Sequence, residues 1–411
     1  MDIKTQRKID LYAGTLICRL LSLFIRKKES VNHAPQKILV ILLSEMGSLV
    51  LARPMFNKLK SKYPDAELYG LLFRQNRIML EILGDVPVQN IITVRNDSFF
   101  QMISTSIRAL VQMRRLKIDT VIDCELFSRI SSIFSFLSGA TVRVGFHPHN
   151  QEGLYRGSLL NRPILYNPYY HIAQQFITLA EAIGAPWGMP KVKRMIEAVE
   201  VQQQFQVQFL QEEIEEYKSK FFKDFPNIKP KKIVLLYPSG GLLPIRAWPL
   251  RNYCEISKSL LEMGYAVAII GMPDDKDLSK QIQTHCNHED CIDLAGYTAS
   301  IRELMILFQF TSLLITNDGG PGHFAAMTPI PSIIFYGPET PLLYGPMTEN
   351  TFVFHKPLSC SPCLTAYNHR NSPCDGNNQC LKLIGHEEVI EKAVEMLSKE
   401  SEKSTCRQSD G

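Results

Sequence analysis

Residues 312–326 read SLLITNDGGPGHFAA, and this stretch decides the fold that the sequence predicts. An apolar strand runs through Thr316 into a turn with two glycines, and a helix opens near Pro321. Backbone N–H groups at such a helix start, beside glycines that allow close approach, favour an anionic ligand such as a diphosphate. A tight turn in which Asp318 caps the helix explains the same residues equally well.

Short apolar runs recur along the chain in two series, and a helix-like segment follows each run. This is the β-α-β pattern of a doubly wound parallel sheet. We therefore predict two Rossmann-like α/β domains with parallel sheets that face a central cleft. The runs of the first series are 37–44, 67–73, 90–94, 120–124 and 142–146, and those of the second are 233–237, 265–271, 291–294, 313–316 and 332–336.

The two series set the expected domain boundaries. The first domain covers 36–190 and includes a helix over 49–63; the second covers 231–398. Between them, 191–230 forms a helical linker with its helix over 197–222. The chain begins with an amphipathic segment, 1–35, and ends with a tail, 399–411, that is predicted to be disordered.

Composition indicates a folded globular protein. Of the 411 residues, 45% are hydrophobic and 21% are charged, and the length suits two domains of ordinary size. The formal net charge of +4 is small for this length, so no nucleic-acid partner is expected.

The N-terminal segment is apolar over 9–25 and has basic residues on both sides. It contains Asp10 and Arg19 and is too short and too polar to span a bilayer. It also lacks the small-residue cleavage pattern of a secretory signal, so we expect the chain to stay in the cytoplasm. We predict a helix that lies on the inner face of the cytoplasmic membrane; a helix packed on the body of the protein is the alternative.

The second domain carries further motifs at the end of its first strand. Pro238-Ser239-Gly240-Gly241 is a turn of small residues at the carboxyl end of a strand, where α/β sheets bind ligands. Arg246 follows soon after and can neutralise a diphosphate. We predict that Trp248 is an anchor of the core.

Four spaced motifs of this half resemble glycosyltransferase family 9, the ADP-heptose–lipopolysaccharide heptosyltransferases and their relatives. They are 238–240 (PSG), 246–249 (RAWP), 293–296 (DLAG) and the stretch from 312 through Gly337-Pro338. The resemblance covers nearly all of 37–395 and is weaker in the N-terminal half. It implies an inverting, metal-independent transferase of the GT-B architecture, with the nucleotide sugar on the C-terminal domain and the acceptor on the N-terminal domain.

The resemblance also implies a set of donor-binding residues. Arg246 stands where the family usually has lysine, and Thr298 follows the strand near Asp293, where the family commonly has a polar residue. The implied contacts to the donor's diphosphate and sugar come from Ser239, Gly240, Arg246, Thr298, Asp318, Gly319, Gly320 and His323.

The first domain departs from the family at the catalytic loop. The family typically shows Ser-x-x-Gly-Asp after the first strand, with the aspartate proposed as the base, whereas this chain has Ser44-Glu45-Met46-Gly47-Ser48. A serine hydroxyl cannot by itself take the acceptor's proton. We predict that Glu45 is the base, on an acceptor-side loop with Ser44, Gly47 and Ser48. Three alternatives stay open: Glu45 caps the next helix, the base comes from elsewhere, or activity is lost.

The predicted function is therefore transfer of a sugar, heptose or a hexose-like unit, from a nucleotide diphosphate to a lipopolysaccharide-type or other lipid-linked glycan. One alternative is a nucleotide-sugar epimerase of the same architecture. The other is a non-catalytic nucleotide-sugar-binding homologue, which the loss of the family's aspartate at Ser48 favours.

Four of the ten cysteines fall within the loop 360–380. A Cys-x2-Cys pair followed by two more cysteines can bind zinc tetrahedrally, although the second pair has an unusual spacing. We predict a structural staple, either zinc or disulfides, and no cofactor that catalysis requires. The residues are Cys360, Cys363, Cys374 and Cys380.

Overall fold

The computed structural model describes residues 3–25, 34–147, 155–185 and 206–409, without positions 369, 373 and 375. The chain divides into two units. Unit 1 contains Met1–Gln203 together with Ala366–His369, and unit 2 contains Gln204–Thr365 and Arg370–Gly411. The division falls within the predicted linker 191–230, of which 191–205 lies outside the described residues.

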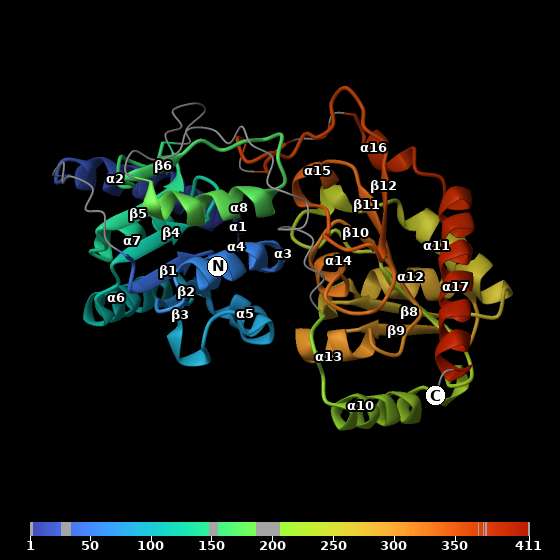
Figure 1. The fold of residues 1–411 in the computed structure, drawn as a ribbon. Coiled ribbons are helices and arrows are strands. Elements are labelled where there is room, and N and C mark those ends of the chain that lie inside the picture. Colours follow the sequence, from blue (N-terminus) through green and yellow to red (C-terminus); the bar gives the residue numbers. More distant parts are fainter. Residues whose placement is uncertain are drawn as a thin grey trace. The chain divides into compact units, whose positions relative to one another are not determined.

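Unit 1 is a six-stranded parallel sheet in the order β3-β2-β1-β4-β5-β6 (Figure 1). The strands are continuous apolar runs, as a sheet covered on both faces requires. They are β1 (Lys37–Ile41), β2 (Glu67–Phe73), β3 (Ile91–Val94), β4 (Thr120–Asp123), β5 (Val142–Phe146) and β6 (Arg162–Ile164), and the helices between and after them are α3 (Met46–Leu51), α4 (Arg53–Lys62), α5 (Arg77–Leu83), α6 (Phe99–Leu116), α7 (Arg129–Leu137) and α8 (Ile172–Glu181).

Unit 2 repeats this plan with the strand order β12-β11-β10-β7-β8-β9, again all parallel. Its strands are β7 (Ile233–Tyr237), β8 (Ala266–Gly271), β9 (Cys291–Ala295), β10 (Leu313–Asn317), β11 (Ser332–Tyr336) and β12 (Thr351–His355). Its helices are α10 (Gln211–Asp224), α11 (Leu250–Glu262), α12 (Lys276–Cys286), α13 (Ile301–Leu307), α14 (Gly320–Ala325), α15 (Pro341–Tyr344), α16 (Gln379–Lys382) and α17 (His386–Ser409).

Both sheets have the Rossmann strand order, so the predicted pair of doubly wound domains is confirmed. In each unit the direction of winding reverses beside the first strand, between β1 and β4 and between β7 and β10. Ligands of such sheets bind in the crevice at this switch point, outside the carboxyl ends of the strands. The loops after these four strands are therefore the places where functional residues are expected.

The core of unit 2 confirms the predicted role of Trp248. Its side chain is 1% exposed and its ring stacks on Phe335 with centroids 4.3 Å apart. The indole N–H donates to the Ile384 carbonyl at 3.1 Å, which joins the start of α11 to the segment before α17.

The N-terminal segment packs on unit 1. It forms α1 (Ile3–Ile9), a π-helical turn at Asp10–Gly14 and α2 (Thr15–Ser22). Asp10 accepts hydrogen bonds from the backbone N–H groups of Arg129 (3.0 Å) and Ile130 (2.9 Å), at the start of α7. The alternative, that the segment packs on the body of the protein, is thus confirmed for its inner side. Its outer side is exposed. The described helices include none that is both long enough and apolar enough to cross a membrane.

Several predicted elements differ from the structure. Strands β6 and β12 were not predicted: β6 has only three residues, among them Arg162 and Pro163, and four of the five residues of β12 are only partly buried. The helix predicted over 49–63 is two helices, α3 and α4, because the chain breaks at Ala52 just before Pro54. The linker helix lies at Gln211–Asp224, and α17 continues to Ser409 into the tail predicted to be disordered.

Candidate active site

The predicted donor residues of unit 2 surround Asn317, the last residue of β10. Its side chain is fully buried and its amide donates to the carbonyls of Pro238 and Ser239, both at 3.0 Å. Its side-chain oxygen, Oδ1, accepts a hydrogen bond from the Trp248 backbone N–H at 2.8 Å. One side chain therefore ties the carboxyl ends of β7 and β10 together at the switch point of unit 2. Asn317 was not among the predicted site residues.

Arg246 lies in this crevice and is held by two acidic residues. Its Nη2 is 2.9 Å from Glu339 Oε1, and its Nε is 3.5 Å from Asp318 Oδ2. Arg370 Nε also contacts Glu339 Oε1 at 2.9 Å, and the Arg370 guanidinium lies over the Tyr344 ring at 4.9 Å. The carboxylates are nearly inaccessible, with side-chain exposures of 6% for Asp318 and 3% for Glu339. The two arginines and the two carboxylates thus neutralise one another's charge. Their contacts restrain the Arg246 side chain.

Asp318 and Arg246, both predicted as donor-binding residues, are therefore in contact with each other. Glu339 and Arg370 were not predicted. Glu339 follows Gly337-Pro338 directly after β11, the strand next to β10. An acidic residue at the carboxyl end of a neighbouring strand was the available signal. Arg370 had no comparable signal, because it lies far along the chain in an irregular loop.

The turn after β10 differs in detail from the sequence prediction. The residue that caps α14 is Gly319 rather than Asp318, and its backbone is extended. A Cβ at Gly319 would have no atom closer than 4.0 Å, whereas a Cβ at Gly322 would lie 2.5 Å from Ile334 Cδ1. Gly322 is thus required for the packing of α14 on β11, and Gly319 leaves room for a ligand to approach the backbone. Gly320 begins α14, and His323 lies in it with 7% exposure.

The other predicted donor residues occupy the same edge of the sheet. Ser239 is 8% exposed, and its hydroxyl accepts from the Gly241 backbone N–H at 3.1 Å. Gly240 belongs to the same turn after β7. Thr298 follows β9, which is separated from β7 by β8, so it lies at the outer end of the crevice.

The loop predicted to serve the acceptor follows β1 in unit 1. Glu45 precedes α3 and is half-buried, and its side chain makes no capping hydrogen bond to that helix. Glu45 thus occupies the N-cap position of α3, but its side chain does not cap the helix. Its Oε2 instead accepts a hydrogen bond from the Ser48 hydroxyl at 2.8 Å. The serine that replaces the expected aspartate thus orients Glu45, and Gly47 lies between them in the first turn of α3.

A second carboxylate, Glu125, lies beside this loop and was missed. It follows β4, on the other side of the switch point from β1. Its Oε1 accepts from the backbone N–H groups of Leu43 (2.5 Å) and Ser44 (3.1 Å), and the Ser44 hydroxyl lies 3.3 Å from both of its oxygens. Burial, followed by the charges of Glu45 and Asp123, raises the pKa of the Glu125 carboxyl to about 7. Glu125 therefore exchanges its proton near neutral pH.

The buried side chain of Arg156 fixes the loop that carries Glu125. Arg156 Nη1 donates to the carbonyls of Glu125 and Ser128, both at 3.2 Å, and Arg156 Nη2 pairs with Asp123 Oδ2 at 3.0 Å. The Arg156 and Asp123 side chains are 1% and 0% exposed. Phe127, between Glu125 and Ser128 in this loop, has a φ of 65°, which is a strained backbone conformation for a bulky residue. Such strain persists only where surrounding contacts enforce it, so this loop has one defined shape.

Glu125 should make the stability of unit 1 depend on pH. Its pKa in the folded state, about 7, is above the ordinary 4.5, so between these values the folded state binds more protons than the unfolded state. The free energy of unfolding should then fall as pH rises through this window, by about 3 kcal/mol in total. Glu125→Gln cannot ionise and should flatten this dependence. Unfolding midpoints measured from pH 5 to pH 8 test this, with Glu212→Gln, an exposed glutamate of unit 2, as the control; an unchanged pH profile in Glu125→Gln contradicts it.

The four cysteines of the loop 360–380 are free thiols in the structure. Burial raises the pKa of Cys380, and the nearby thiols of Cys363, Cys374 and Cys360 raise it further, so the four belong to one neighbourhood. Among the described residues, however, no group of three or more His, Cys, Asp or Glu side chains is arranged to hold a metal ion.

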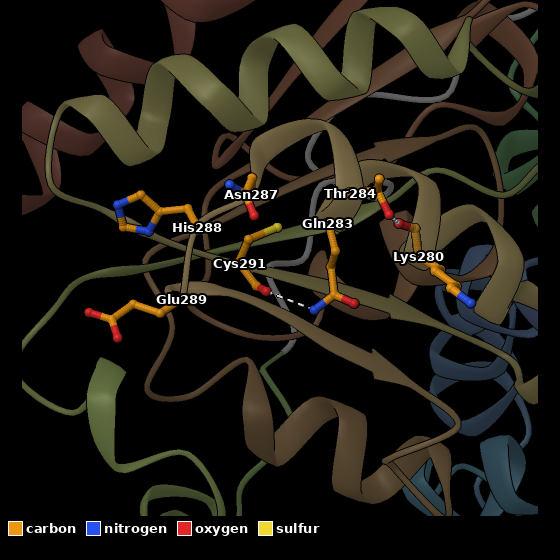
Figure 2. A pocket seen from close by; sticks show the side chains of 7 residues that line it. All are labelled: Lys280, Gln283, Thr284, Asn287, His288, Glu289 and Cys291. Atoms are coloured by element: carbon orange, nitrogen blue, oxygen red, sulfur yellow. Dashed lines mark hydrogen bonds between the residues drawn. The ribbon is translucent and has the colours of Figure 1, made fainter.

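A pocket of about 380 Å³ lies elsewhere in unit 2, between the end of α12 and the start of β9 (Figure 2). Gln283 and Cys291 line it, and the Gln283 amide donates to the Cys291 carbonyl at 2.8 Å. Because this is the amino end of β9, the pocket is at the opposite edge of the sheet from Arg246 and does not belong to the donor site.

Comparison with known proteins agrees with this geometry. The family model described as glycosyltransferase family 9 (heptosyltransferase) matches residues 107–372. The chain belongs to glycosyltransferase family 9. This glycosyltransferase is 23% identical over 377 residues to lipopolysaccharide heptosyltransferase 2 of Salmonella typhimurium, an alignment that covers 89% of this chain and 99% of the relative.

Solved structures show the same fold. The ADP-heptose lipopolysaccharide heptosyltransferase II of Escherichia coli superimposes with a TM-score of 0.67 at 22% identity, over 89% of this glycosyltransferase and 100% of that chain. The Escherichia coli heptosyltransferase WaaC, solved with ADP-2-deoxy-2-fluoro heptose, gives 0.59 at 14% identity, over 88% and 99%.

Proposed function

We propose that this glycosyltransferase moves a heptose from ADP-heptose to a lipopolysaccharide-type glycan, with inversion at the anomeric carbon. The observation that carries the proposal is the restrained Arg246 at the switch point of unit 2, in a chain that aligns with nearly the whole length of a lipopolysaccharide heptosyltransferase. The name and the bound ligand of the two Escherichia coli structures identify ADP-heptose or its analogue as the donor of those proteins.

The proposed donor site lies on unit 2. Arg246 faces the diphosphate, while Asp318 and Glu339 keep its guanidinium in place. The backbone near Gly319 and Gly320 and the turn at Ser239-Gly240 approach the phosphates, and His323 and Thr298 serve the rest of the donor. A cation that is already restrained loses little side-chain freedom when it meets the leaving diphosphate.

The reaction needs a base, which unit 1 supplies as Glu45. An acceptor hydroxyl attacks the anomeric carbon from the side opposite to ADP, so one C–O bond forms as the bond to the diphosphate breaks. The hydroxyl's proton passes to the Glu45 carboxylate, which Ser48 orients. The negative charge that develops on ADP is stabilised by Arg246, so no metal is needed for this step.

The decisive experiment is incubation with ADP-heptose, with and without a deacylated or detergent-solubilised core acceptor. Release of ADP that requires the acceptor, with a product one heptose heavier, is the expected result. Isomerised sugar without acceptor indicates an epimerase, and donor binding without turnover indicates a non-catalytic homologue; either outcome overturns the proposal. Neither alternative is favoured by the family or by the relatives.

The proposed place of action is the inner face of the cytoplasmic membrane. Its support is the nature of the acceptor, since a lipopolysaccharide precursor is anchored in that membrane by its lipid. The N-terminal segment supports it too, because basic Arg7, Lys8 and Arg19 lie beside exposed apolar residues.

A structural zinc ion in the loop 360–380 is proposed as well: its four thiols share one neighbourhood, although they are not arranged as a ligand set in the structure, so zinc would have to draw them together. Zinc would staple an irregular loop and take no part in the reaction. We expect about one zinc per chain in protein purified without chelator, and its loss in Cys360→Ser/Cys363→Ser. Elemental analysis measures this, and Cys254→Ser, a buried cysteine of α11, is the matched control. Metal-free native protein contradicts it.

A further inference from the structure

We propose that one side of unit 1 docks on an anionic lipid bilayer through a face made from two separate pieces of the chain. This docking face consists of the outer side of the segment from the π-helical turn through α2 and the outer side of α6. It rests on the proposed function and deepens it, because it names the surface that meets the membrane.

The N-terminal part of the docking face is strongly apolar. Phe24, just after α2, is 73% exposed, and Tyr12 in the π-helical turn is 72% exposed. The inner side of the same segment is fixed to the body through Asp10 and through Cys18, which is fully buried. The exposed set is Leu11, Tyr12, Leu16, Ile17, Leu20, Leu23 and Phe24.

Helix α6 contributes a second apolar stripe, which the sequence analysis did not identify. Its inner side packs in the core of unit 1 through Met102, Ala109 and Met113. Its outer side carries Phe100, 83% exposed, and further apolar residues three, seven and eleven positions later, which share one helix face. A helix that is apolar on its solvent side as well as on its core side marks an interaction surface. The exposed residues are Phe99, Phe100, Ile103, Ile107 and Val111.

The two parts lie on the same side of the sheet. The crossovers through α6 and α7 both run toward β5, so right-handed connections put both helices on one face. The N-terminal segment packs there too: Ile9 joins the core cluster of α6, and Gln6 Oε1 accepts from Asn96 Nδ2 at 3.4 Å, just before α6. Helix α2 contacts α7 (Figure 1). The outer sides of the N-terminal segment and of α6 therefore belong to the same flank of unit 1.

The charges on this flank select its partner. The exposed charged residues of the docking face that the structure describes include Arg19, Arg108 and Arg115, and Arg7 and Lys8 are exposed on the adjoining α1. The one acidic residue of these elements, Asp10, is engaged by Arg129. A two-fold dimer through this face would bring like charges together. Anionic lipid headgroups complement the basic residues while the apolar side chains enter the interface.

Co-sedimentation of the full chain with vesicles tests the proposal. Binding to vesicles that contain phosphatidylglycerol should exceed binding to pure phosphatidylcholine and should weaken with salt. Leu16→Ser/Leu20→Ser and Phe100→Ser/Ile107→Ser should each lower the partition by about tenfold or more, since they remove exposed apolar area. Leu210→Ser changes a leucine of unit 2 that is more exposed than Leu16 or Leu20, and this variant should bind like the native protein.

The outcomes separate this proposal from the proposed function. Variants of the docking face should keep full ADP release with a detergent-solubilised acceptor, since none of the changed residues belongs to the active site. Native binding by the Phe100→Ser/Ile107→Ser variant overturns the composite face. The proposal is also overturned if the native protein does not bind vesicles and is a dimer in analytical ultracentrifugation, while the Phe100→Ser/Ile107→Ser variant is a monomer. Vesicle binding without any transferase activity would instead contradict the proposed function alone.

Discussion

Glu45→Gln is expected to lower acceptor-dependent ADP release by about 10²- to 10⁴-fold, the range typical of a lost general base. The amide has nearly the shape of the carboxylate and can still accept the hydrogen bond of Ser48, but it cannot take the acceptor's proton. Donor binding should be unchanged, because the donor residues belong to unit 2. Single-turnover ADP release and calorimetric titration with ADP measure the two quantities.

A rescue experiment sharpens this prediction. Ser48 stands where the family typically has aspartate, so Ser48→Asp in the Glu45→Gln background should recover part of the lost rate. Ser48→Ala alone should give a smaller loss, because it removes only the hydroxyl that orients Glu45. Full turnover by Glu45→Gln would exclude Glu45 as the base. Glu125→Gln would then be the next variant to measure, since Glu125 is the other carboxylate next to this loop.

Arg246→Ala is expected to weaken ADP binding by about ten- to several-hundred-fold. A charged hydrogen bond contributes about 1.5–3 kcal/mol, and Arg246 is the predicted cation for the diphosphate. The substitution also removes the Arg246 cation from the buried Asp318 and Glu339 carboxylates, so repulsion of the phosphates should increase. Titration with ADP measures the affinity, and the unfolding midpoint shows whether unit 2 remains folded.

Two variants serve as controls for Arg246→Ala. Arg246→Lys keeps the cation that the family usually has at this position and should retain most of the affinity. Arg251→Ala removes an exposed arginine on α11 of the same unit and should leave binding unchanged. Native ADP affinity in a folded Arg246→Ala protein would remove Arg246 from the donor site.

Much of the fold could be predicted from the sequence because buried parallel strands are continuous apolar runs. The predicted runs 67–73, 142–146, 233–237 and 332–336 coincide with β2, β5, β7 and β11. The two strands that were missed, β6 and β12, end their sheets. The other two edge strands, β3 and β9, were predicted, so the edge position is not the reason; β6 is short and contains Arg162 and Pro163, and β12 is only partly buried, so neither is a continuous buried apolar run.

The candidate site was predictable where its residues lie next to a strand in sequence. Asp318, Gly319 and Ser239 directly follow strands, and the loop from Ser44 to Ser48 follows β1. Glu125 and Glu339 also follow strands, β4 and β11, but their function depends on which strand lies next to which. Strand order is a property of the assembled sheet and leaves no mark in the local sequence.

The sequence by itself determined the two Rossmann-like sheets, the family and the residue types at the ends of the first strands. Local apolar periodicity and turn chemistry are enough for this, because each acts over a few neighbouring residues. Only the tertiary structure decided that Ser48 orients Glu45, that Glu125 titrates near neutral pH, and that Glu339 and Asp318 hold Arg246. It also joined α6 to the N-terminal segment in one apolar flank. Burial, electrostatic interaction and shared surface arise between residues far apart in the chain, so they exist only once the chain has folded.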